Sequence, residues 1–564
     1  MTNEALNQVF QIAADHHQRG ALAEAARIYA QILEIDPSYG PALKSYGVLL
    51  CQAGEFVAGA EILGHATTVM PHDAEAWSNL GNALRILEQS DEAIRACERA
   101  VELDPGQKFA LNNLSAALRQ ASRIGESIEA ARRALQIDPD FVDAAINLAS
   151  GHQAAGEIEE ALSVLQRVSG ASEGLRDNLL FTSLYSDAIS EEEITRLHVR
   201  QASRPEPLPK SPSLKRIGFV SGDLRAHPVG KFLLPLLKEI VGLEVVLYAS
   251  QIFDDEVSAE LRGAATGWRN VYGQSAEAVA EMVRSDGIDI LIDLAGHSAL
   301  NRLDVFRLRC APVQVTYLGY SATTGEPNMD WILADEVLIP QSSEHLYTER
   351  VARMPVPFLT GKITPSPRRV PSPHIRFASF NNPAKMSPTC LDAWAEILRR
   401  VPESSLLLKY KFFESDYVAE RFLREFSLRE ISAERIVTLG HDTAERHAAR
   451  FGEIDIALDT FPYTGATTTM DALSRGIPTI TYAGPRYVSR MSASLLAALD
   501  MPELIATSTE EYVEIAVSLA LSTVERERIA TRILDQFPSS PLVDGKTQAA
   551  NFAAALHGIW TDTN

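Results

Sequence analysis

Four prolines recur at a constant interval of 34 residues in the first third of the chain. They are Pro37, Pro71, Pro105 and Pro139. Small residues keep the same phase at Gly47, Gly81, Ser115 and Ala149. A constant interval of this length is typical of stacked helix-turn-helix units, in which each proline follows the second helix and ends it without breaking it. The interval therefore predicts a helical solenoid.

The tetratricopeptide repeat is the helical unit with this period. We predict about five such units in an all-α superhelix over residues 1–170. Glycine marks the turn inside the unit at Gly20, Gly54 and Gly156, and Glu88 and Ser122 are exceptions. Solenoids of this kind present a long concave surface that binds extended polypeptide. We therefore expect the rest of the chain to act on a protein held by the repeats.

A polar column runs through the array at the same interval. It consists of Asn79, Asn113 and Asn147. Asparagine is a mediocre helix residue, because its side chain competes for backbone hydrogen bonds. A carboxamide both donates and accepts, so a column of them matches the backbone of a bound peptide without reading its sequence. The alternative is a solvated column or a hydrogen-bond ladder between repeats.

The composition is that of an ordinary globular protein, with 46% hydrophobic and 22% charged residues in 564. The net charge of −22 makes nucleic acid and anionic membranes poor partners. Four scattered cysteines without a CxxC pair argue against disulfides and structural zinc. The N-terminal residues lack the features of a secretory signal, and no stretch approaches about 18 apolar residues. We therefore expect a cytoplasmic protein without a membrane span.

The pattern changes after the repeats. Residues 171–213 predict a connector with one more helix-turn-helix and a proline-rich end. Short apolar runs then alternate with helical stretches in two sets, residues 214–360 and 374–564, with a proline-dense segment at 354–373 between them. Such alternation is typical of parallel sheets covered on both faces. We predict two Rossmann-like domains facing a cleft, with residues 485–564 completing the second domain and the chemistry in loops after the strands.

Two of these loops carry candidate catalytic residues. His227, in SGDLRAHPVGKF, follows the predicted strand RIGFV; it could contact a substrate hydroxyl or transfer a proton, or it could simply cap or pack the loop. Lys385, in ASFNNPAKMSP, follows the predicted strand IRFASF and is a candidate phosphate clamp; the alternative is a surface lysine. Loss of a diphosphate leaving group needs such a cation if no metal supplies one.

A third loop, in LDTFPYTGATTTMDAL, runs from a strand into a helix. Thr467 and Thr468 predict an anion site at the helix start, although either residue could be a plain N-cap. Asp471, which we expect in the first helical turn, could bind a ribose diol or favour the helix dipole. The loop matches neither of the two common glycine-rich phosphate motifs, so dehydrogenase and P-loop readings are weak.

Other polar residues near the predicted cleft are less specific. His447 could stack on a base or lie on a helix surface. Asp286 and Asp289 flank the predicted strand IDILIDLAGH, beside His297, and are candidates for assisting an acceptor hydroxyl. No group of residues with metal-ligand spacing is evident.

Several segments, in this order, resemble those of one enzyme family. They are GFVSGDLRAHPVGKF, GIDILIDLAGH, LRCAPVQVTYLGYSATTGEPNMDWILAD, ASFNNPAKMSP, LDTFPYTGATTTMDAL and RMSASLLAALDMPELIA. The family is that of the protein O-linked N-acetylglucosamine transferases and their SPINDLY relatives, glycosyltransferase family 41, in a bacterial-type form. The resemblance covers the chain nearly end to end. It implies a GT-B fold and an inverting enzyme that moves a sugar from a nucleotide to Ser or Thr of proteins, without a metal or other cofactor.

The resemblance also implies residue roles. His227 would lie at the sugar and the acceptor, and Lys385 would hold the diphosphate and stabilise the leaving group. Asn382 would line the nucleotide site and His447 would stack on the base. Thr467 and Thr468 would bind phosphate, and Asp471 the ribose. The column of Asn79, Asn113 and Asn147 would grip the acceptor protein, and a homodimer formed through the repeats is left open.

One position departs from the family pattern. The N-acetylglucosamine enzymes have a histidine before the threonine pair, where this chain has Ala466. The surrounding string is closer to the SPINDLY branch, some members of which use GDP-fucose. UDP-N-acetylglucosamine is the default donor, GDP-fucose is the alternative, and a bacterial surface sugar placed on flagellin-like proteins is a third.

Two interpretations assign the chain to another class of protein. One is a repeat scaffold with an inert transferase domain. The other is a glycosyltransferase for small molecules or glycans, which leaves the repeats unexplained.

Overall fold

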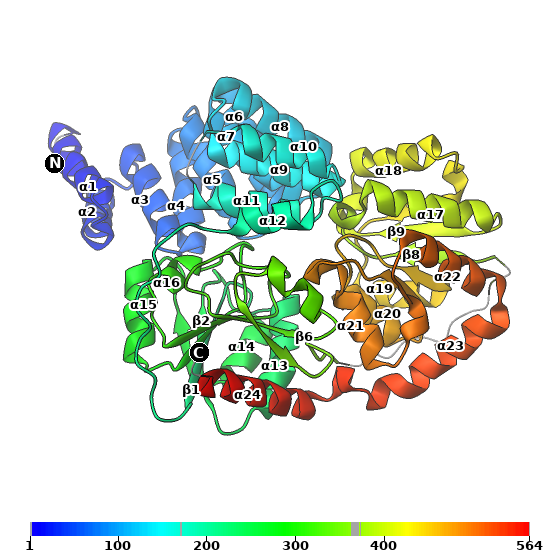
Figure 1. The fold of residues 1–564 in the computed structure, drawn as a ribbon. Helices are drawn as coiled ribbons and strands as arrows, with labels where there is room; N and C mark the ends of the chain where they lie inside the picture. The colour runs from blue at the N-terminus through cyan, green and yellow to red at the C-terminus, as the bar shows by residue number, and fades with distance from the viewer. Residues whose placement is uncertain (1–2, 170–171, 363–371, 373, 563–564) are drawn as a thin grey trace. The chain divides into compact units, whose positions relative to one another are not determined.

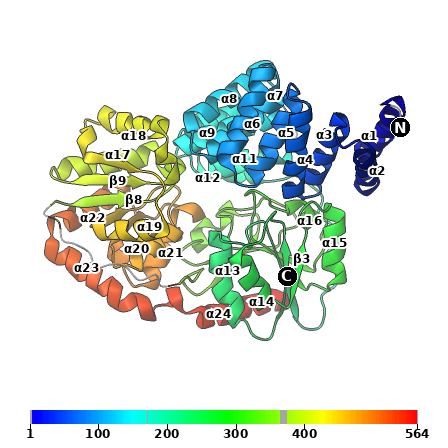
Figure 2. The same cartoon turned by 180° about the vertical axis from the view of Figure 1, so that it is seen from behind.

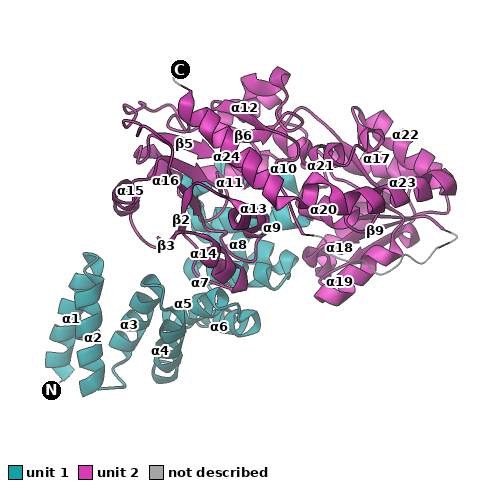
Figure 3. Ribbon diagram, turned by 90° about the horizontal axis from the view of Figure 1, so that it is seen from below, with its two compact units in different colours: residues 1–175 teal, residues 176–564 magenta. Residues whose placement is uncertain are grey.

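The computed structural model describes residues 3–169, 172–362, 372 and 374–562. The chain divides into two compact units, residues 1–175 and 176–564 (Figure 3). The predicted boundary at 170–171 and part of the proline-dense segment 354–373 lie outside the described residues.

The first unit is a series of helix pairs. Residues 3–169 form five pairs: α1 (Asn3–Gln18), α2 (Leu22–Ile35), α3 (Gly40–Gln52), α4 (Phe56–Val69), α5 (Ala74–Ile86), α6 (Ser90–Leu103), α7 (Lys108–Gln120), α8 (Ile124–Ile137), α9 (Val142–Ala155) and α10 (Ile158–Arg167). Each of the four periodic prolines lies two residues beyond the end of a second helix, α2, α4, α6 or α8. The predicted helical array is confirmed.

Glycine at the recurring position of the first helix, 34 residues apart at Gly47 and Gly81, permits close packing inside a repeat. A Cβ atom added at Gly47 would lie 2.6 Å from Leu63 Cγ, and one at Gly81 would lie 2.3 Å from Cys97 Sγ. Both distances are shorter than real side chains tolerate, so a larger residue would force the two helices of the pair apart.

The second unit contains two lobes, each built on a parallel sheet. The first lobe has the strand order β3-β2-β1-β4-β5-β6-β7. Its strands are β1 (Arg216–Ser221), β2 (Glu244–Ala249), β3 (Gly267–Asn270), β4 (Ile290–Asp293), β5 (Val313–Thr316), β6 (Trp331–Asp335) and β7 (Arg350–Met354). Helices α13 (Pro228–Glu239) and α14 (Glu256–Ala264) contribute to the core on one face, and α15 (Ala276–Ser285) and α16 (Leu303–Arg307) to the core on the other.

The second lobe has the strand order β10-β9-β8-β11-β12-β13, again parallel throughout. Its strands are β8 (Arg376–Ser379), β9 (Ser405–Lys409), β10 (Ile436–Leu439), β11 (Ile456–Leu458), β12 (Thr479–Tyr482) and β13 (Ile505–Ala506). Its helices are α17 (Pro388–Arg400), α18 (Asp416–Leu428), α19 (Ala444–Arg450), α20 (Thr467–Leu473), α21 (Met491–Ala498), α22 (Thr509–Leu521) and α23 (Thr523–Gln536). The prediction of two Rossmann-like domains is confirmed.

The last helix, α24 (Gly545–Thr561), corrects the predicted domain assignment, because it belongs to the first lobe. It lies beside α13 in both views (Figures 1 and 2). Its Phe552 stacks on Phe219 of β1, with 6.0 Å between ring centroids. Residues 485–564 therefore do not all complete the second domain; the chain returns to the first sheet because α24 carries an apolar face that the core around Phe219 buries.

Residues 176–200 are the part of the predicted 171–213 connector that packs on both lobes of the second unit. The name connector is used below for these residues. The connector contains most of α11 (Glu173–Ser183) and all of α12 (Glu191–His198), and Ser190 caps α12 by accepting the Glu193 N–H. His198 Nε2 lies 2.6 Å from the Tyr320 hydroxyl of the first lobe. Arg486 of the second lobe forms an ion pair with Glu191. The connector is therefore a structural part of the two-lobed unit.

Candidate functional site

The strand order places one topological switch point in each sheet. The order reverses between β1 and β4 in the first lobe and between β8 and β11 in the second. Ligands of open α/β sheets bind outside the carboxyl ends of the strands at such points. The loops after β1 and β8 carry His227 and Lys385, and Thr467 begins the helix that follows the β11 loop, so these residues lie at the expected edges.

Lys385 ends a short 3₁₀ turn (Pro383–Lys385) between β8 and α17. Its Nζ donates to the Thr464 carbonyl at 2.8 Å and lies 4.3 Å from the centroid of the Tyr463 ring. Burial lowers the pKa of Lys385 to about 8, while the charge of Asp459 opposes that shift. The amine is therefore mostly protonated at neutral pH, and this cation contacts the loop that follows β11.

Asp459 holds that loop in place. It is buried at the end of β11, and its Oδ1 accepts the Gly465 N–H at 2.7 Å and the Thr460 N–H at 2.9 Å. Its Oδ2 accepts the Thr481 hydroxyl of β12 at 2.8 Å. Burial raises the pKa of Asp459, and these hydrogen bonds oppose the rise. The carboxylate thus fixes the turn from which the Thr464 carbonyl reaches Lys385.

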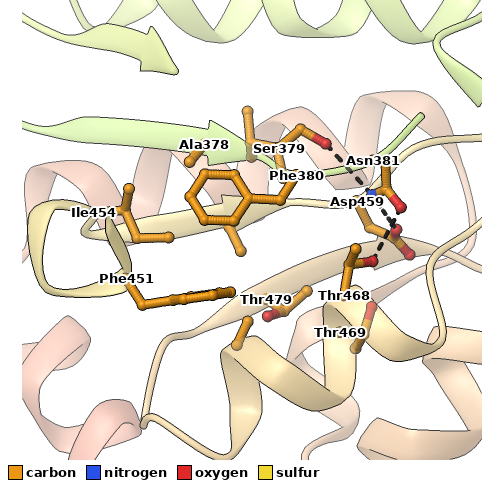
Figure 4. A pocket seen from close by; sticks show the side chains of 13 residues that line it. Ala378, Ser379, Phe380, Asn381, Phe451, Ile454, Asp459, Thr468, Thr469 and Thr479 are labelled. Carbon is orange, nitrogen blue, oxygen red and sulfur yellow. Dashed lines mark hydrogen bonds between the residues drawn. The ribbon is translucent and has the colours of Figure 1, made fainter. Parts of the chain in front are cut away.

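A small pocket lies beside Asp459, between the ends of β8 and β11 and the start of α20 (Figure 4). The rings of Phe380 and Phe451 line one end, and Asn381, Asp459 and Thr468 line the other. Thr468 Oγ1 donates to Asn381 Oδ1 at 3.0 Å, which ties the start of α20 to the end of β8. The cavity has an apolar end and a polar end, and its free space of about 20 Å³ is enough for about one water molecule.

Helix α20 begins at Thr467, and its N-cap position is Ala466, whose side chain makes no cap hydrogen bond. Thr467 and Thr468 are therefore the first two helical residues rather than N-caps. Asp471 lies beyond the first turn, in contrast to the prediction, because the helix starts at Thr467 rather than closer to Asp471. It forms an ion pair with Arg475, 3.3 Å away. Asn382 caps the 3₁₀ turn and accepts the Ala384 N–H at 3.1 Å.

His447, on α19, reaches the aromatic end of the pocket. Its ring centroid lies 5.7 Å from that of Phe380 and 5.3 Å from that of Phe451. Its Nδ1 lies 3.1 Å from Nζ of Lys409. Burial, followed by the charge of Lys409, lowers the pKa of His447. Because an ammonium only donates, Nδ1 is the acceptor and the neutral ring carries its proton on Nε2.

His227 is the N-cap of α13 and accepts the Val229 N–H through Nδ1 at 3.4 Å. The same nitrogen lies 3.5 Å from Oδ2 of Asp223. Burial lowers the pKa of His227 and raises that of Asp223. His227 therefore caps α13, which is the alternative interpretation given from the sequence. About 40% of its side chain is exposed beside the switch point of the first sheet.

The structure corrects the interpretation of Asp286 and Asp289, which lie at the amino end of β4, away from the ligand-binding edge. Asp286 pairs with Arg269, and Asp289 accepts the backbone N–H groups of Lys215 and Arg216. Strand direction is the reason: both residues precede β4, and Asp293 is the carboxylate at its carboxyl end. His297 is buried between Asp177 and the Thr324 carbonyl.

Within the described ranges, no three His, Cys, Asp or Glu side chains gather in a way that could hold a metal ion. No helix among the described residues is both long and apolar enough to cross a bilayer.

The asparagine column makes hydrogen bonds between repeats. Asn113 Nδ2 donates to Ser78 Oγ at 3.0 Å, and Asn147 Nδ2 donates to Asn112 Oδ1 at 2.8 Å. The ladder that we gave as the alternative interpretation therefore exists at these two positions. Asn79, Asn113 and Asn147 are all only partly buried, so part of each residue is exposed to solvent.

Three residues that contribute to the site were not singled out from the sequence. Asn381 was not chosen because its neighbour Asn382 was. Lys409 is the last residue of strand β9, and Tyr463 lies in the loop before α20, where only the threonines were considered. Lys409 could have been identified from the sequence, because it lies at the carboxyl end of β9, where ligands bind in open α/β sheets. The contacts of Tyr463 join segments far apart in the sequence and left no local signal.

Comparison with known proteins places these features in a family. The sequence model of glycosyl transferase family 41 matches residues 186–365 and 362–552. Tetratricopeptide-repeat models match residues 74–107 and 118–173. The chain is 35% identical over 363 residues to a probable UDP-N-acetylglucosamine–peptide N-acetylglucosaminyltransferase SPINDLY of Petunia hybrida, covering 61% of this chain and 38% of that protein. It is 29% identical over 367 residues to the related SEC protein of Arabidopsis thaliana, covering 61% of this chain and 37% of that one.

A solved structure is also similar. A mutant of the Thermobaculum terrenum O-GlcNAc transferase superposes with a TM-score of 0.80 at 29% identity, covering 86% of this chain and 97% of that one.

The fold and the site define a two-lobed transferase of the Rossmann type with tetratricopeptide repeats at its N-terminal end. The chain belongs to glycosyltransferase family 41. The predicted family and the predicted enzyme class, a glycosyltransferase, are confirmed. The chain spans about two-fifths of the length of the curated relatives named here.

Proposed function

We propose that the chain is an inverting protein O-glycosyltransferase that moves a sugar from a nucleoside diphosphate to Ser or Thr of proteins bound by the repeats. Lys385 carries the proposal. Its charged ammonium lies at the switch point of the second sheet, beside a pocket with an aromatic and a polar end. A cation here would stabilise the diphosphate as the sugar leaves, which is the task that a metal performs in other enzymes.

The other predicted residues are assigned to the same reaction. Thr467 and Thr468 would bind phosphate, Asp471 and Asn382 would contact the nucleoside, and His447 would stack on the base near Phe380 and Phe451. His227, on the first lobe, would contact the sugar and the acceptor hydroxyl. No metal or other cofactor takes part in the proposed mechanism.

UDP-N-acetylglucosamine is the first donor to test, because the names of the relatives specify it. GDP-fucose is the alternative, since Ala466 replaces the histidine of the N-acetylglucosamine enzymes and offers the donor no polar side chain. An inert transferase domain attached to a repeat scaffold is the competing function.

Donor turnover tests the proposal. Purified protein is incubated with UDP-N-acetylglucosamine, UDP-glucose, GDP-fucose and CMP-linked acidic sugars, and nucleotide release is measured. We expect release from one donor, and a loss of about 10²–10³-fold in Lys385→Ala. Lys411→Ala, which removes an exposed lysine from the same lobe, is the matched control and should retain wild-type turnover. Equal activity of Lys385→Ala and wild type would overturn the phosphate-clamp assignment, and no release from any donor, with or without protein acceptors, would favour the inert scaffold.

Acceptor binding by the asparagine column has its own test. Replacing Asn79, Asn113 and Asn147 together with alanine should raise KM for protein acceptors and leave hydrolysis of the nucleotide sugar unchanged. The matched control is the Ser78→Ala, Asn112→Ala double variant, which removes the side-chain partners between repeats, leaves the backbone carbonyl partners and keeps the column. Equal loss of acceptor use in both variants would show that the column acts only by holding neighbouring repeats together.

A further inference from the structure

The Tyr463 ring lies between Lys385 and the connector. Nζ of Lys385 lies 4.3 Å from its centroid. The ring of Tyr185, in the connector, stacks on Tyr463 with 4.8 Å between centroids and 20° between planes. Because a stacked ring already fills one face of Tyr463, the ammonium occupies the other face.

The surroundings of Tyr463 fix its orientation. The ring packs against a buried cluster formed by Leu184 and Ile194 of the connector, Tyr320 and Ala322 of the first lobe, and Val488 of the second. Its hydroxyl lies near the Ser321 side chain of the first lobe, which lowers the pKa of Tyr463 against the larger rise caused by burial. Three segments of the two-lobed unit therefore meet at one aromatic ring, and little freedom remains for it to move.

The stretch of connector behind the ring is also anchored. Arg486 binds the Glu191 carboxylate at 2.6 Å and the carbonyls of Ser186 and Ile189 at 3.0 and 2.5 Å. Asp187 accepts the N–H and the hydroxyl of Thr389, at the start of α17. This stretch, which immediately follows Tyr185, thus lies against the second lobe near the turn that carries Lys385.

We propose that Tyr463, backed by Tyr185, is a positioning residue that holds the Lys385 ammonium at the phosphate site. The inference rests on the proposed function of Lys385 and deepens it. The negative face of an aromatic ring attracts a cation more strongly than a neutral amine, so the contact favours the charged form of the lysine. The Thr464 carbonyl acts in the same sense by accepting from Nζ, and Asp459 adds its charge.

The expected pH dependence of kcat/KM follows because the Tyr463 ring favours the charged form of Lys385. The charged lysine is the active form, so kcat/KM falls as the pH rises through the pKa of Lys385, which is about 8. Loss of the ring removes an attraction for the charged form and lowers that pKa. The basic limb of the kcat/KM profile should therefore move to lower pH by about 0.5–1 unit in Tyr463→Leu.

Four variants separate positioning from general packing. Tyr463→Phe keeps the ring and should retain the wild-type basic limb. Tyr463→Leu should show the full shift, and Tyr185→Leu a smaller shift in the same direction. Tyr272→Leu removes a partly buried tyrosine from the first lobe and serves as the control, with no shift expected. An unchanged basic limb in Tyr463→Leu would overturn the proposal.

A second measurement does not depend on turnover. The rate at which acetic anhydride modifies Lys385, followed by mass spectrometry from pH 6 to pH 10, reports the pKa of its amine directly. We expect a lower pKa in Tyr463→Leu than in wild type and in Tyr463→Phe; equal values in all three would refute the inference. Full activity of Lys385→Ala would refute the proposed function instead, and this labelling experiment would still decide whether Tyr463 acts on the lysine.

Discussion

The turn inside each repeat needs a residue with a left-handed backbone. The chain places glycine there at Gly20, Gly54 and Gly156, with φ between 76° and 85°. Glu88 and Ser122 hold the same turn position with φ of 62° and 60°. Side chains with a Cβ atom are strained in this conformation, so these two repeats fold at a local cost that the packing of neighbouring helices offsets.

Glu88→Gly should therefore stabilise its repeat. Glu88 is exposed, so the substitution removes backbone strain and loses little contact; we expect local opening to become about 0.5–1 kcal/mol less favourable, after the larger chain entropy of glycine is subtracted. Slower amide hydrogen exchange in α5 and α6 is the measurement. Gly20→Ala is the converse control: its added Cβ would meet no atom within 4 Å, so faster exchange in α1 and α2 would report backbone strain alone. Unchanged or faster exchange in Glu88→Gly would contradict the argument.

Single residues also show where sequence reasoning succeeds. Lys385 and His227 were found because each follows an apolar strand, and parallel strands bring their carboxyl ends to one edge. Asp286 and Asp289 were misread because both precede β4, and the same rule places residues before a strand at the opposite edge of the sheet. Tyr463 could not be found in this way, because its contacts with Tyr185 and Ser321 join segments far apart in the chain.

At the scale of elements, regular periodicity predicted most of the fold. The prolines located the ends of four helices because proline cannot continue a helix. In the first sheet, the strands β3 (Gly267–Asn270) and β7 (Arg350–Met354) were missed, since their sequences GWRN and RVARM lack a continuous apolar run. Both are edge strands, which need to bury less surface than central strands and so carry a weaker apolar signal.

At the scale of the whole molecule, the structure differs from the sequence prediction in the lobe to which the last helix, α24, belongs. Chain order assigned α24 to the second lobe, because it follows α22 and α23. The structure instead packs Phe552, Leu556 and Trp560 into the core of the first lobe. Lys210 reinforces this docking by donating to the Trp560 carbonyl at 2.9 Å. An amphipathic helix shows which of its faces is apolar, but it does not show which of two similar sheets will cover that face.

Phe552→Ala tests the docking of α24. Phe552 is fully buried and contacts Phe219 and Tyr317 of the first sheet, so its truncation should cost about 3–5 kcal/mol of local stability. Hydrogen exchange should therefore rise in β1 and β2 and stay unchanged in β9 and β10. Phe422→Ala, an equally buried ring on α18 of the second lobe, should give the opposite pattern. If Phe552→Ala loosened β9 and β10 while β1 and β2 stayed protected, the helix would belong to the second lobe, and the domain assignment made from chain order would be right.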